Sequence, residues 1–341
     1  MMRLTSVLGA LLAGALFSAG AALAQGSGSA TLDAIRARGQ LVCGVGGSIA
    51  GFSLPDSQGV MRGLDADSCR AVAAAILGDA GKVKFVPTTT TNRFTALQSG
   101  EVDVLLRTTT WTLAREANLG LLFAGVNFYD GTGFMVKKSL GVKSAKELDG
   151  ATICVQPGTS TELALADYFR VNNIKFTPIL IADLPEGRAA FLSGRCDAYS
   201  TDGSQLATFR ATQPNKDELL LLPEVISKEP LGYVVRKGDD KFFDLVRWTY
   251  FAQLIAEENG ITSKNIDSFA ASTIPDIRRL LGLEGDLGKA LGVDNKFAYN
   301  VIKQVGNFAE IWERDMGVLG VPRGLNALWN KGGLQYAPPM R

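Results

Sequence analysis

Arg-Thr-Thr-Thr-Trp-Thr-Leu-Ala-Arg occupies residues 107–115 and follows the apolar run Val102–Leu106. The run predicts a short buried strand that ends at hydroxyl side chains, with the cation of Arg115 shortly after them. In open α/β sheets, ligands bind beyond the carboxyl ends of the strands. Hydroxyls, free backbone N–H groups and a guanidinium at such a place suit a carboxylate. The alternative is purely structural, because threonine is β-branched and favours strands for that reason alone.

Strand and helix signals alternate around this stretch, in the order strand, helix, strand, helix, strand: 40–45, 63–77, 83–86, 93–98 and 102–106. This alternation predicts a parallel sheet covered by helices. The 107–115 stretch then lies at the carboxyl end of the third strand. Asp65 and Asp67 near the start of the 63–77 helix are interpreted as caps, which satisfy free N–H groups and suit the helix dipole.

A second unit of the same kind follows, with signals at 151–155, 162–170, 177–181, 185–192 and 196–202. Its first strand leads into Gln156-Pro-Gly-Thr-Ser-Thr161, where free N–H groups beside hydroxyls form either an anion site or an ordinary N-cap. Its last strand ends in Asp202, which holds a place equivalent to that of 107–115; a buried N-cap is the alternative. The last hundred residues show helical signals and no charged constellation, so we interpret them as core and packing.

The composition indicates an exported, folded protein. Its 341 residues exceed one typical domain, and 46% hydrophobic with 20% charged residues predicts a real core. Residues 1–24 carry only Arg3 as a charge, an apolar run from Val7 and small residues at Ala22 and Ala24, which predicts a signal peptide cleaved after Ala24 and a periplasmic location. An uncleaved anchor helix is the alternative, although the run is short for a span of about 20 residues.

The absence of histidine excludes Ser-His-Asp and Cys-His catalytic sites and His-ligated zinc. The net charge of +1 falls to zero once Arg3 leaves with the leader, so we expect no nucleic-acid partner. Four cysteines allow three disulfide connectivities. We favour Cys43–Cys69 and Cys154–Cys196, because each bond then joins residues of one unit; a zinc site is the less favoured alternative, and no metal is expected.

Taken as an ordered set, the motifs resemble those of the periplasmic polar amino-acid-binding proteins of ABC importers, and most closely the general L-amino-acid-binding subgroup. They are Gly63-Leu-Asp-Ala-Asp67, Leu97-Gln-Ser-Gly-Glu-Val-Asp103, residues 108–115, Gly158-Thr-Ser160 and Gly194-Arg-Cys-Asp-Ala-Tyr-Ser-Thr-Asp202. The resemblance spans essentially the whole mature chain. It implies a two-lobed α/β fold of the type II, venus-flytrap class with two crossover hinge strands: lobe 1 from 31–132 plus 233–341, including a C-terminal helical extension, and lobe 2 from 133–232.

The resemblance also implies a ligand site between the lobes. Arg115 matches the arginine that holds the α-carboxylate, and Asp202 matches the acid that takes the α-ammonium. Hydroxyl and backbone contacts map onto Thr108 and Thr110 in one lobe, and onto Gly158, Thr159 and Ser160 in the other. Alternation along an extended segment predicts that Arg107 and Trp111 point away from the ligand.

One region departs from the family pattern. Where many relatives place an aromatic clamp after the first strand, this chain has Gly46-Gly-Ser-Ile-Ala-Gly51, which leaves Phe52 as the nearest ring. Phe52 either walls the pocket or caps the core. A small, uncharged wall suits a site that accepts many side chains.

The implied function is capture of L-amino acids, with broad specificity, for delivery to an ABC permease. The implied protein is a monomeric binding protein without a cofactor, not an enzyme. The alternative is a periplasmic enzyme on the same scaffold, such as a cyclohexadienyl or arogenate dehydratase.

Overall fold

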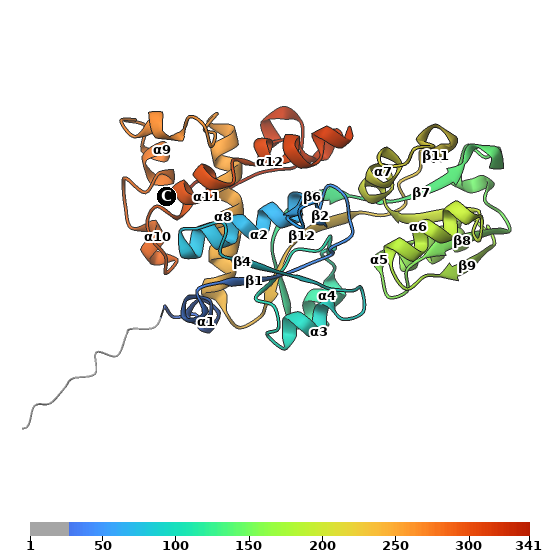
Figure 1. Cartoon of the computed structure of the whole chain (residues 1–341), viewed down its shortest axis with the longest axis horizontal. Coiled ribbons are helices and arrows are strands. Elements are labelled where there is room, and N and C mark those ends of the chain that lie inside the picture. Colours follow the sequence, from blue (N-terminus) through green and yellow to red (C-terminus); the bar gives the residue numbers. More distant parts are fainter. Residues whose placement is uncertain (1–26) are drawn as a thin grey trace, which may run out of the picture.

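The computed structural model describes residues 27–341, so the predicted signal peptide lies outside the described residues. The chain forms two separate five-stranded sheets, each with its own helices, and Figure 1 shows the two parts side by side. The first sheet has the strand order β4 (Val83–Pro87), β1 (Leu41–Val45), β5 (Val104–Leu105), β12 (Glu229–Arg236) and β6 (Leu121–Asp130). The second has the order β11 (Leu219–Leu221), β7 (Thr132–Lys137), β10 (Ala198–Asp202), β8 (Ala151–Val155) and β9 (Phe176–Leu180).

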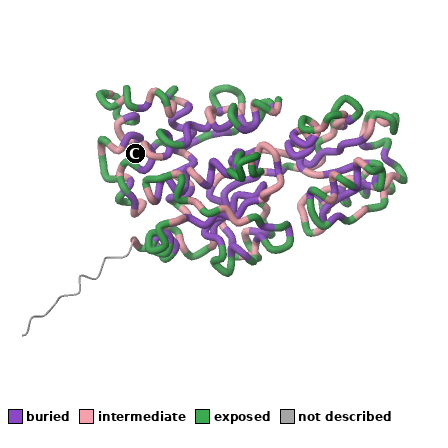
Figure 2. The backbone as a smooth tube through the Cα atoms, viewed as in Figure 1, coloured by how far each residue is buried: buried purple, intermediate pink, exposed green. Residues whose placement is uncertain are grey.

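We call the first sheet with its helices lobe 1 and the second lobe 2. The helices of lobe 1 are α1 (Ala30–Arg38), α2 (Leu64–Leu77), α3 (Arg93–Gln98), α4 (Leu113–Asn118), α8 (Asp240–Glu258), α9 (Pro275–Leu280), α10 (Leu287–Ala290), α11 (Phe297–Gln304) and α12 (Phe308–Asp315). Those of lobe 2 are α5 (Ser160–Val171), α6 (Leu184–Ser193) and α7 (Gly203–Ala211). A small hairpin of β2 (Leu54–Pro55) and β3 (Met61–Arg62) completes lobe 1. Buried residues run along the strands of both sheets (Figure 2).

The two-lobed α/β fold expected from the sequence is confirmed. In lobe 1, β1 pairs in parallel with β4 and β5 as predicted, although the third strand is only two residues long. The sequence did not predict β6, which pairs antiparallel with β12 and is the longest strand of the described chain. These two strands lead between the lobes, because β7 follows β6 after Gly131, and β12 follows β11 on the way back.

The β6–β12 pair leaves no room for a side chain at one point. A Cβ atom added at Gly232 would lie 1.8 Å from the carbonyl oxygen of Gly125, so only glycine fits there. The ladder also changes register on both sides of this contact, between Leu231 and Gly232 and between Tyr233 and Val234. Such irregularities bend a strand and increase its local twist.

Both predicted disulfides are confirmed. Cys43 of β1 is bonded to Cys69 of α2, and Cys154 of β8 is bonded to Cys196 just before β10. Each bond fastens a helix or loop to the sheet of its own lobe. Within residues 27–341, no helix has the length and apolarity needed to cross a membrane.

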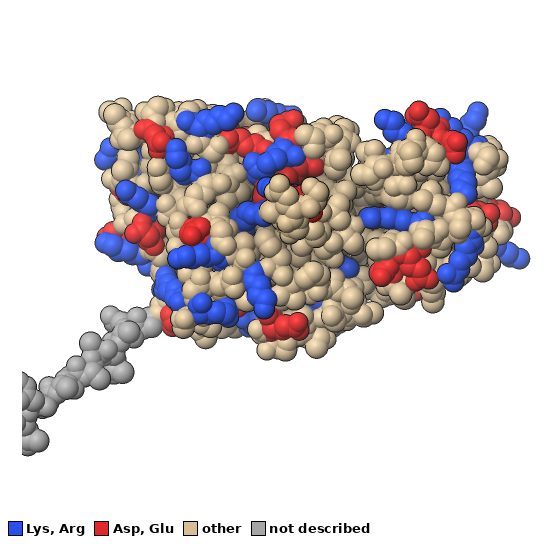
Figure 3. Space-filling model, in the orientation of Figure 1, with Lys and Arg blue, Asp and Glu red and all other residues tan. Residues whose placement is uncertain are grey.

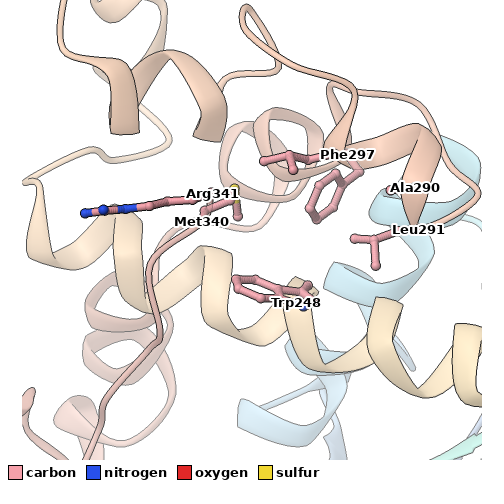
Figure 4. Close-up of a pocket in the computed structure, with 7 residues that line it drawn as sticks. Trp248, Ala290, Leu291, Phe297, Met340 and Arg341 are labelled. Carbon is pink, nitrogen blue, oxygen red and sulfur yellow. The ribbon is translucent and has the colours of Figure 1, made fainter.

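The C-terminal helices pack on lobe 1, with α11 against α2 and α8 (Figure 1). The segment 297–315 forms two helices, α11 and α12, because Gly306 adopts a φ of +104° and Asn307 begins α12 with a capping box. Near the chain end, Trp248, Leu291, Phe297 and Met340 line an apolar pocket of about 170 Å³ (Figure 4).

The sequence interpretation missed a partly buried charge cluster that joins this extension to lobe 1. Asp67 accepts hydrogen bonds from Arg70 at 2.7 Å and from Arg314 of α12 at 2.9 Å, and Asp315 lies beside them. We call Asp67, Arg70, Arg314 and Asp315 the α2–α12 cluster. The expectation of a C-terminal region without a charged constellation is therefore wrong, because Arg314 finds its partner on a helix about 250 residues earlier.

Candidate ligand-binding site

The loops after the carboxyl ends of the strands face one another across the two lobes and enclose a polar cavity. Lobe 1 lines it with Thr90, Arg93, Arg107, Thr108, Thr110 and Arg115. Lobe 2 lines it with Gln156, Thr159, Ser160, Thr161, Leu184, Thr201, Asp202 and Gln205. The cavity thus lies where parallel sheets present ligand sites, and both lobes contribute to it.

Six of the eight predicted ligand residues line this cavity: Thr108, Thr110, Arg115, Thr159, Ser160 and Asp202. Gly158 is not among the lining residues, and its N–H donates to Glu162. Phe52 is fully buried with its ring 5.2 Å from that of Phe128, so it belongs to the core and does not wall the pocket.

Thr108 is held in an unusual backbone conformation by Asp65. Its φ is +40°, in the left-handed region that costs a non-glycine residue about 1–2 kcal/mol. Its N–H donates to Asp65 Oδ2 at 3.1 Å, and Asn127 donates to the other oxygen. Burial raises the pKa of Asp65 to about 6. The interpretation of Asp65 and Asp67 as helix caps is wrong, because α2 has no side-chain cap and both carboxylates bond to distant groups.

Arg115 lies in α4, which Thr112 caps through its side chain. Its Nη1 donates to the carbonyl oxygen of Thr110 at 2.7 Å, and its guanidinium lies over the ring of Phe94. These contacts hold the cation at the cavity wall. Burial lowers its pKa, while Glu229 and Asp202 act in the opposite direction.

Two further arginines line the cavity, and the sequence interpretation assigned neither to it. Arg107 donates from Nε to Thr88 and from Nη2 to Thr90, and burial lowers its pKa to about 10. The expectation that Arg107 points away is therefore wrong, because its backbone is not a regular extended strand at Thr108. Trp111 does point away: its ring stacks on Phe123 and is partly exposed.

Arg93 is the third cavity guanidinium. It is only 3% exposed, and its Nε has no hydrogen-bond partner. Burial lowers its pKa strongly, and the neighbouring Arg107 and Arg115 add to that shift. A guanidinium stays protonated even so, since its ordinary pKa exceeds about 12. One feature of the sequence could have indicated that Arg93 lines the site: it follows the second strand, whose end lies at the same sheet edge as 107–115.

Asp202 is the one carboxylate among the lining residues. It begins α7 without capping it, and its Oδ2 accepts a hydrogen bond from Gln205 at 2.6 Å. Burial raises its pKa well above the usual value, and the negative charges of Asp130 and Glu229 raise it further. A ligand ammonium placed against Asp202 would favour the charged carboxylate.

Glu229 connects the two lobes at the end of the cavity. This carboxylate at the start of β12 is 1% exposed and accepts hydrogen bonds from Thr110 at 2.5 Å and from Ser160 at 2.7 Å. The two hydroxyls also lie 3.1 Å from each other, across the lobes. No local pattern in the sequence singles out Glu229, because its partners come from segments about 70 and 120 residues away.

The lining charges are three guanidiniums against one carboxylate, with Asp65 and Glu229 behind the wall. No group of three or more acidic, cysteine or histidine side chains within residues 27–341 is arranged to hold a metal ion. On the face shown in Figure 3, by contrast, surface charges of both signs are interspersed. Among the side chains that line the cavity, guanidiniums therefore outnumber carboxylates, which suits a ligand with carboxylate groups.

Residues 41–273 match the family of bacterial extracellular solute-binding proteins, family 3. The glutamate/glutamine/aspartate/asparagine-binding protein of Rhodobacter capsulatus is 58% identical over 94% of this chain and 96% of its own. The general L-amino acid-binding periplasmic protein of Rhizobium johnstonii is 53% identical over 98% of this chain and 99% of its own. A Brucella ovis ABC transporter periplasmic binding protein, solved with glutathione bound, superposes with a TM-score of 0.89 at 52% identity, covering 91% and 99% of the two chains.

Proposed function

The chain belongs to the family 3 bacterial extracellular solute-binding proteins, and on that premise we propose that it captures L-amino acids between its lobes and delivers them to an ABC permease. The Rhodobacter capsulatus and Rhizobium johnstonii relatives are both named as amino-acid-binding proteins, the second as a periplasmic one, and the Brucella ovis structure is named as an ABC transporter periplasmic binding protein, which supports this role. They give no support to the dehydratase alternative. The chain is a binding protein and not an enzyme.

The observation that carries the proposal is the placement of Arg115 and Asp202 on opposite lobes around one cavity. A bound amino acid needs an anion partner for its ammonium and a cation partner for its carboxylate. Each charge-assisted hydrogen bond contributes roughly 1.5–3 kcal/mol. Because the two partners lie on different lobes, the ligand stabilises the closed form selectively, and a permease can distinguish that form.

Arg93 and Arg107 extend the proposal to the ligand side chain. With Arg115 on the α-carboxylate, two guanidiniums remain for a second acidic or amide group. The Rhodobacter capsulatus relative is named for glutamate, glutamine, aspartate and asparagine, and glutathione, bound in the Brucella ovis structure, begins with a glutamyl residue whose α-groups are free. We therefore rank glutamate and aspartate first within a broad range of L-amino acids.

Thermal-shift and calorimetric titration of the mature chain with the twenty amino acids tests this function. At about 100 times Kd a ligand adds about 2.7 kcal/mol to the free energy of unfolding, which gives a clear shift. We expect several L-amino acids to bind, with the acidic ones strongest. In Arg93→Met, the affinity for glutamate should fall more than that for glutamine. A protein that none of the twenty stabilises would contradict the proposal.

The remaining features of this proposal follow from the sequence. We propose cleavage after Ala24, release into the periplasm, a monomer without nucleic-acid partners, and lobe limits at 31–132 plus 233–341 and at 133–232. Mass spectrometry of the exported protein would identify its first residue. Light scattering would give its mass in solution.

A further inference from the structure

A second cavity adjoins the ligand site and opens from it. It measures about 230 Å³, whereas the space enclosed by the ligand-site residues themselves is only about 30 Å³. The two cavities share four lining residues: Thr90, Arg107, Gln156 and Leu184. Arg115, Ser160 and Asp202 line only the first. We call the second cavity the annex, and we call Arg115 and Asp202, which are predicted to hold the amino-acid α-groups, the clamp. The annex begins on the side of the site that lies away from the clamp.

Both lobes form the annex. Lobe 1 contributes the loop 46–49 and the segment 87–90, and lobe 2 contributes 183–185 at the start of α6. Arg188 of α6 donates to the carbonyl oxygen of Ser48 at 3.0 Å, which joins the lobes beside this cavity. The annex therefore has defined walls in the closed arrangement.

The annex owes its space to the loop that departs from the family pattern. Gly46 and Gly47 have no side chains, and Gly47 adopts a φ of +75°, which favours glycine. The N–H groups of both residues donate to Ser53, so the loop is fixed as a backbone wall. A Cβ atom added at Gly47 would lie 3.0 Å from the Cβ atom of Pro87, which also lines the annex, so a side chain there would crowd this wall.

The junction with the ligand site carries a donor suited to an amide. Arg107 uses Nε for Thr88 and Nη2 for Thr90, so that Nη1 is left for a ligand oxygen. An oxygen at the γ-carbon of a glutamyl group can accept a hydrogen bond from Nη1. This holds for a free γ-carboxylate and for a γ-amide alike. Beyond this point the walls combine threonine hydroxyls and the carboxylate of Asp183 with Ile49, Leu184 and prolines, a mixture of polar and apolar groups that suits a short peptide.

We infer that the annex accepts the extension of a γ-glutamyl peptide whose glutamyl α-groups are held by Arg115 and Asp202. A γ-linked peptide keeps the free α-ammonium and α-carboxylate that the clamp requires. An α-linked peptide has lost that carboxylate to its peptide bond. The inference rests on the proposed function, because it uses the same clamp and adds a class of ligand to it.

Calorimetric titration with L-glutamate, γ-L-glutamylglycine and α-L-glutamylglycine tests the inference, with none of the probes carrying a thiol that could reduce the disulfides. We expect the γ-linked peptide to bind within about tenfold of glutamate and the α-linked peptide to bind at least about 100-fold more weakly than the γ-linked one. A γ-linked peptide as weak as the α-linked one, with glutamate still tight, would overturn the inference and leave the proposed function intact. Loss of glutamate binding itself would instead contradict the proposed function.

A variant that fills the annex tests whether the annex, and not only the clamp, binds the γ-linked peptide. Ser48 makes only a backbone contact with Arg188 and lines the annex but not the ligand site, so Ser48→Trp fills the annex and spares the clamp. We expect the γ-linked peptide to lose at least about tenfold in affinity and glutamate to stay within about twofold. Ser57→Trp, on the exposed β2–β3 turn, is the matched control and should change neither. Equal losses for both ligands in Ser48→Trp, or unchanged binding of the peptide, would overturn the inference.

Discussion

Lobe 1 holds two groups of charged side chains, the ligand-site arginines and the α2–α12 cluster. The two groups differ in how their buried charged atoms find hydrogen-bond partners. In the ligand site, Arg93 has a buried Nε without an acceptor. In the α2–α12 cluster, Asp315 has a buried Oδ2 without a donor, while Asp67 is bonded to two arginines. A carboxylate can take a proton from water, and the pKa of Asp315 is raised to about 8, chiefly by burial and by Asp67. A guanidinium has no such means of losing its charge.

The difference separates a structural site from a binding site. The α2–α12 cluster can complete itself within the protein and joins α12 to α2. In the ligand site, the buried Nε of Arg93 has no acceptor among the described residues, and an anion that arrives from outside can supply one. Changes in the first group should therefore alter stability and spare ligand affinity, and changes in the second should do the reverse.

Arg115→Ala should have the largest effect. It leaves the ligand carboxylate without its cation and removes a positive charge that interacts with the buried Glu229 and Asp202, and truncation of one partner of such a pair costs roughly 2–5 kcal/mol of binding free energy. Calorimetry with glutamate measures it. Arg314→Ala is the matched control and should keep the wild-type Kd; a control that lost affinity equally would erase the distinction between the two groups.

Arg314→Ala should act on stability instead. It removes two hydrogen bonds to buried Asp67, and leaving a buried acceptor unsatisfied costs about 1–3 kcal/mol, towards the lower end here because the Arg314 side chain is 46% exposed. Urea denaturation without ligand measures the free energy of unfolding. An unchanged midpoint in Arg314→Ala would show that the cluster contributes nothing to the hold of α12 on α2.

Asp315→Asn should change the pH dependence of stability. The native pKa of about 8 lies above the unfolded value of about 3.9, so the native state binds more protons in between and the free energy of unfolding falls as pH rises through that interval. The asparagine of the variant does not titrate, so the variant does not lose this free energy of unfolding as pH rises. Relative to wild type, it should gain about 2 kcal/mol in the free energy of unfolding between about pH 6.5 and about pH 8.5 in urea denaturation. Asp65, Asp130 and Asp202 titrate in both proteins, so the difference isolates Asp315; parallel pH curves would contradict its raised pKa.

Glu229→Gln should give the smallest effect and tests the junction of the lobes. The amide keeps one acceptor oxygen for Thr110 and Ser160 but loses the charge, so affinity should fall by about 0.5–1.5 kcal/mol. Small-angle scattering without ligand should show a larger radius of gyration if the lobes open more. Tighter ligand binding with an unchanged radius would mean that Glu229 competes with the ligand and does not help the lobes to close.

The sequence predicted those parts of the fold and site that depend on local patterns. Alternating strands and helices indicated both sheets, and Arg115, Ser160 and Asp202 lie at strand ends that a parallel sheet brings to one edge. Glu229 could not be predicted, because its partners come from both lobes and have no local signature. Asp67 was misread for the same reason, since a carboxylate near a helix start suggests a cap until its distant partner is known.

The end of the chain covers an open edge of lobe 1. β6 is the last strand of its sheet, and on its free side Asn326 bonds to both backbone groups of Tyr129 while Gln335 donates to the carbonyl oxygen of Val126. An uncovered ten-residue edge strand is a template on which a second molecule can add its own strand. A chain shortened to the family match, which ends at residue 273, would lose Asn326 and Gln335, and we expect its β6 edge to be open to pairing with another strand.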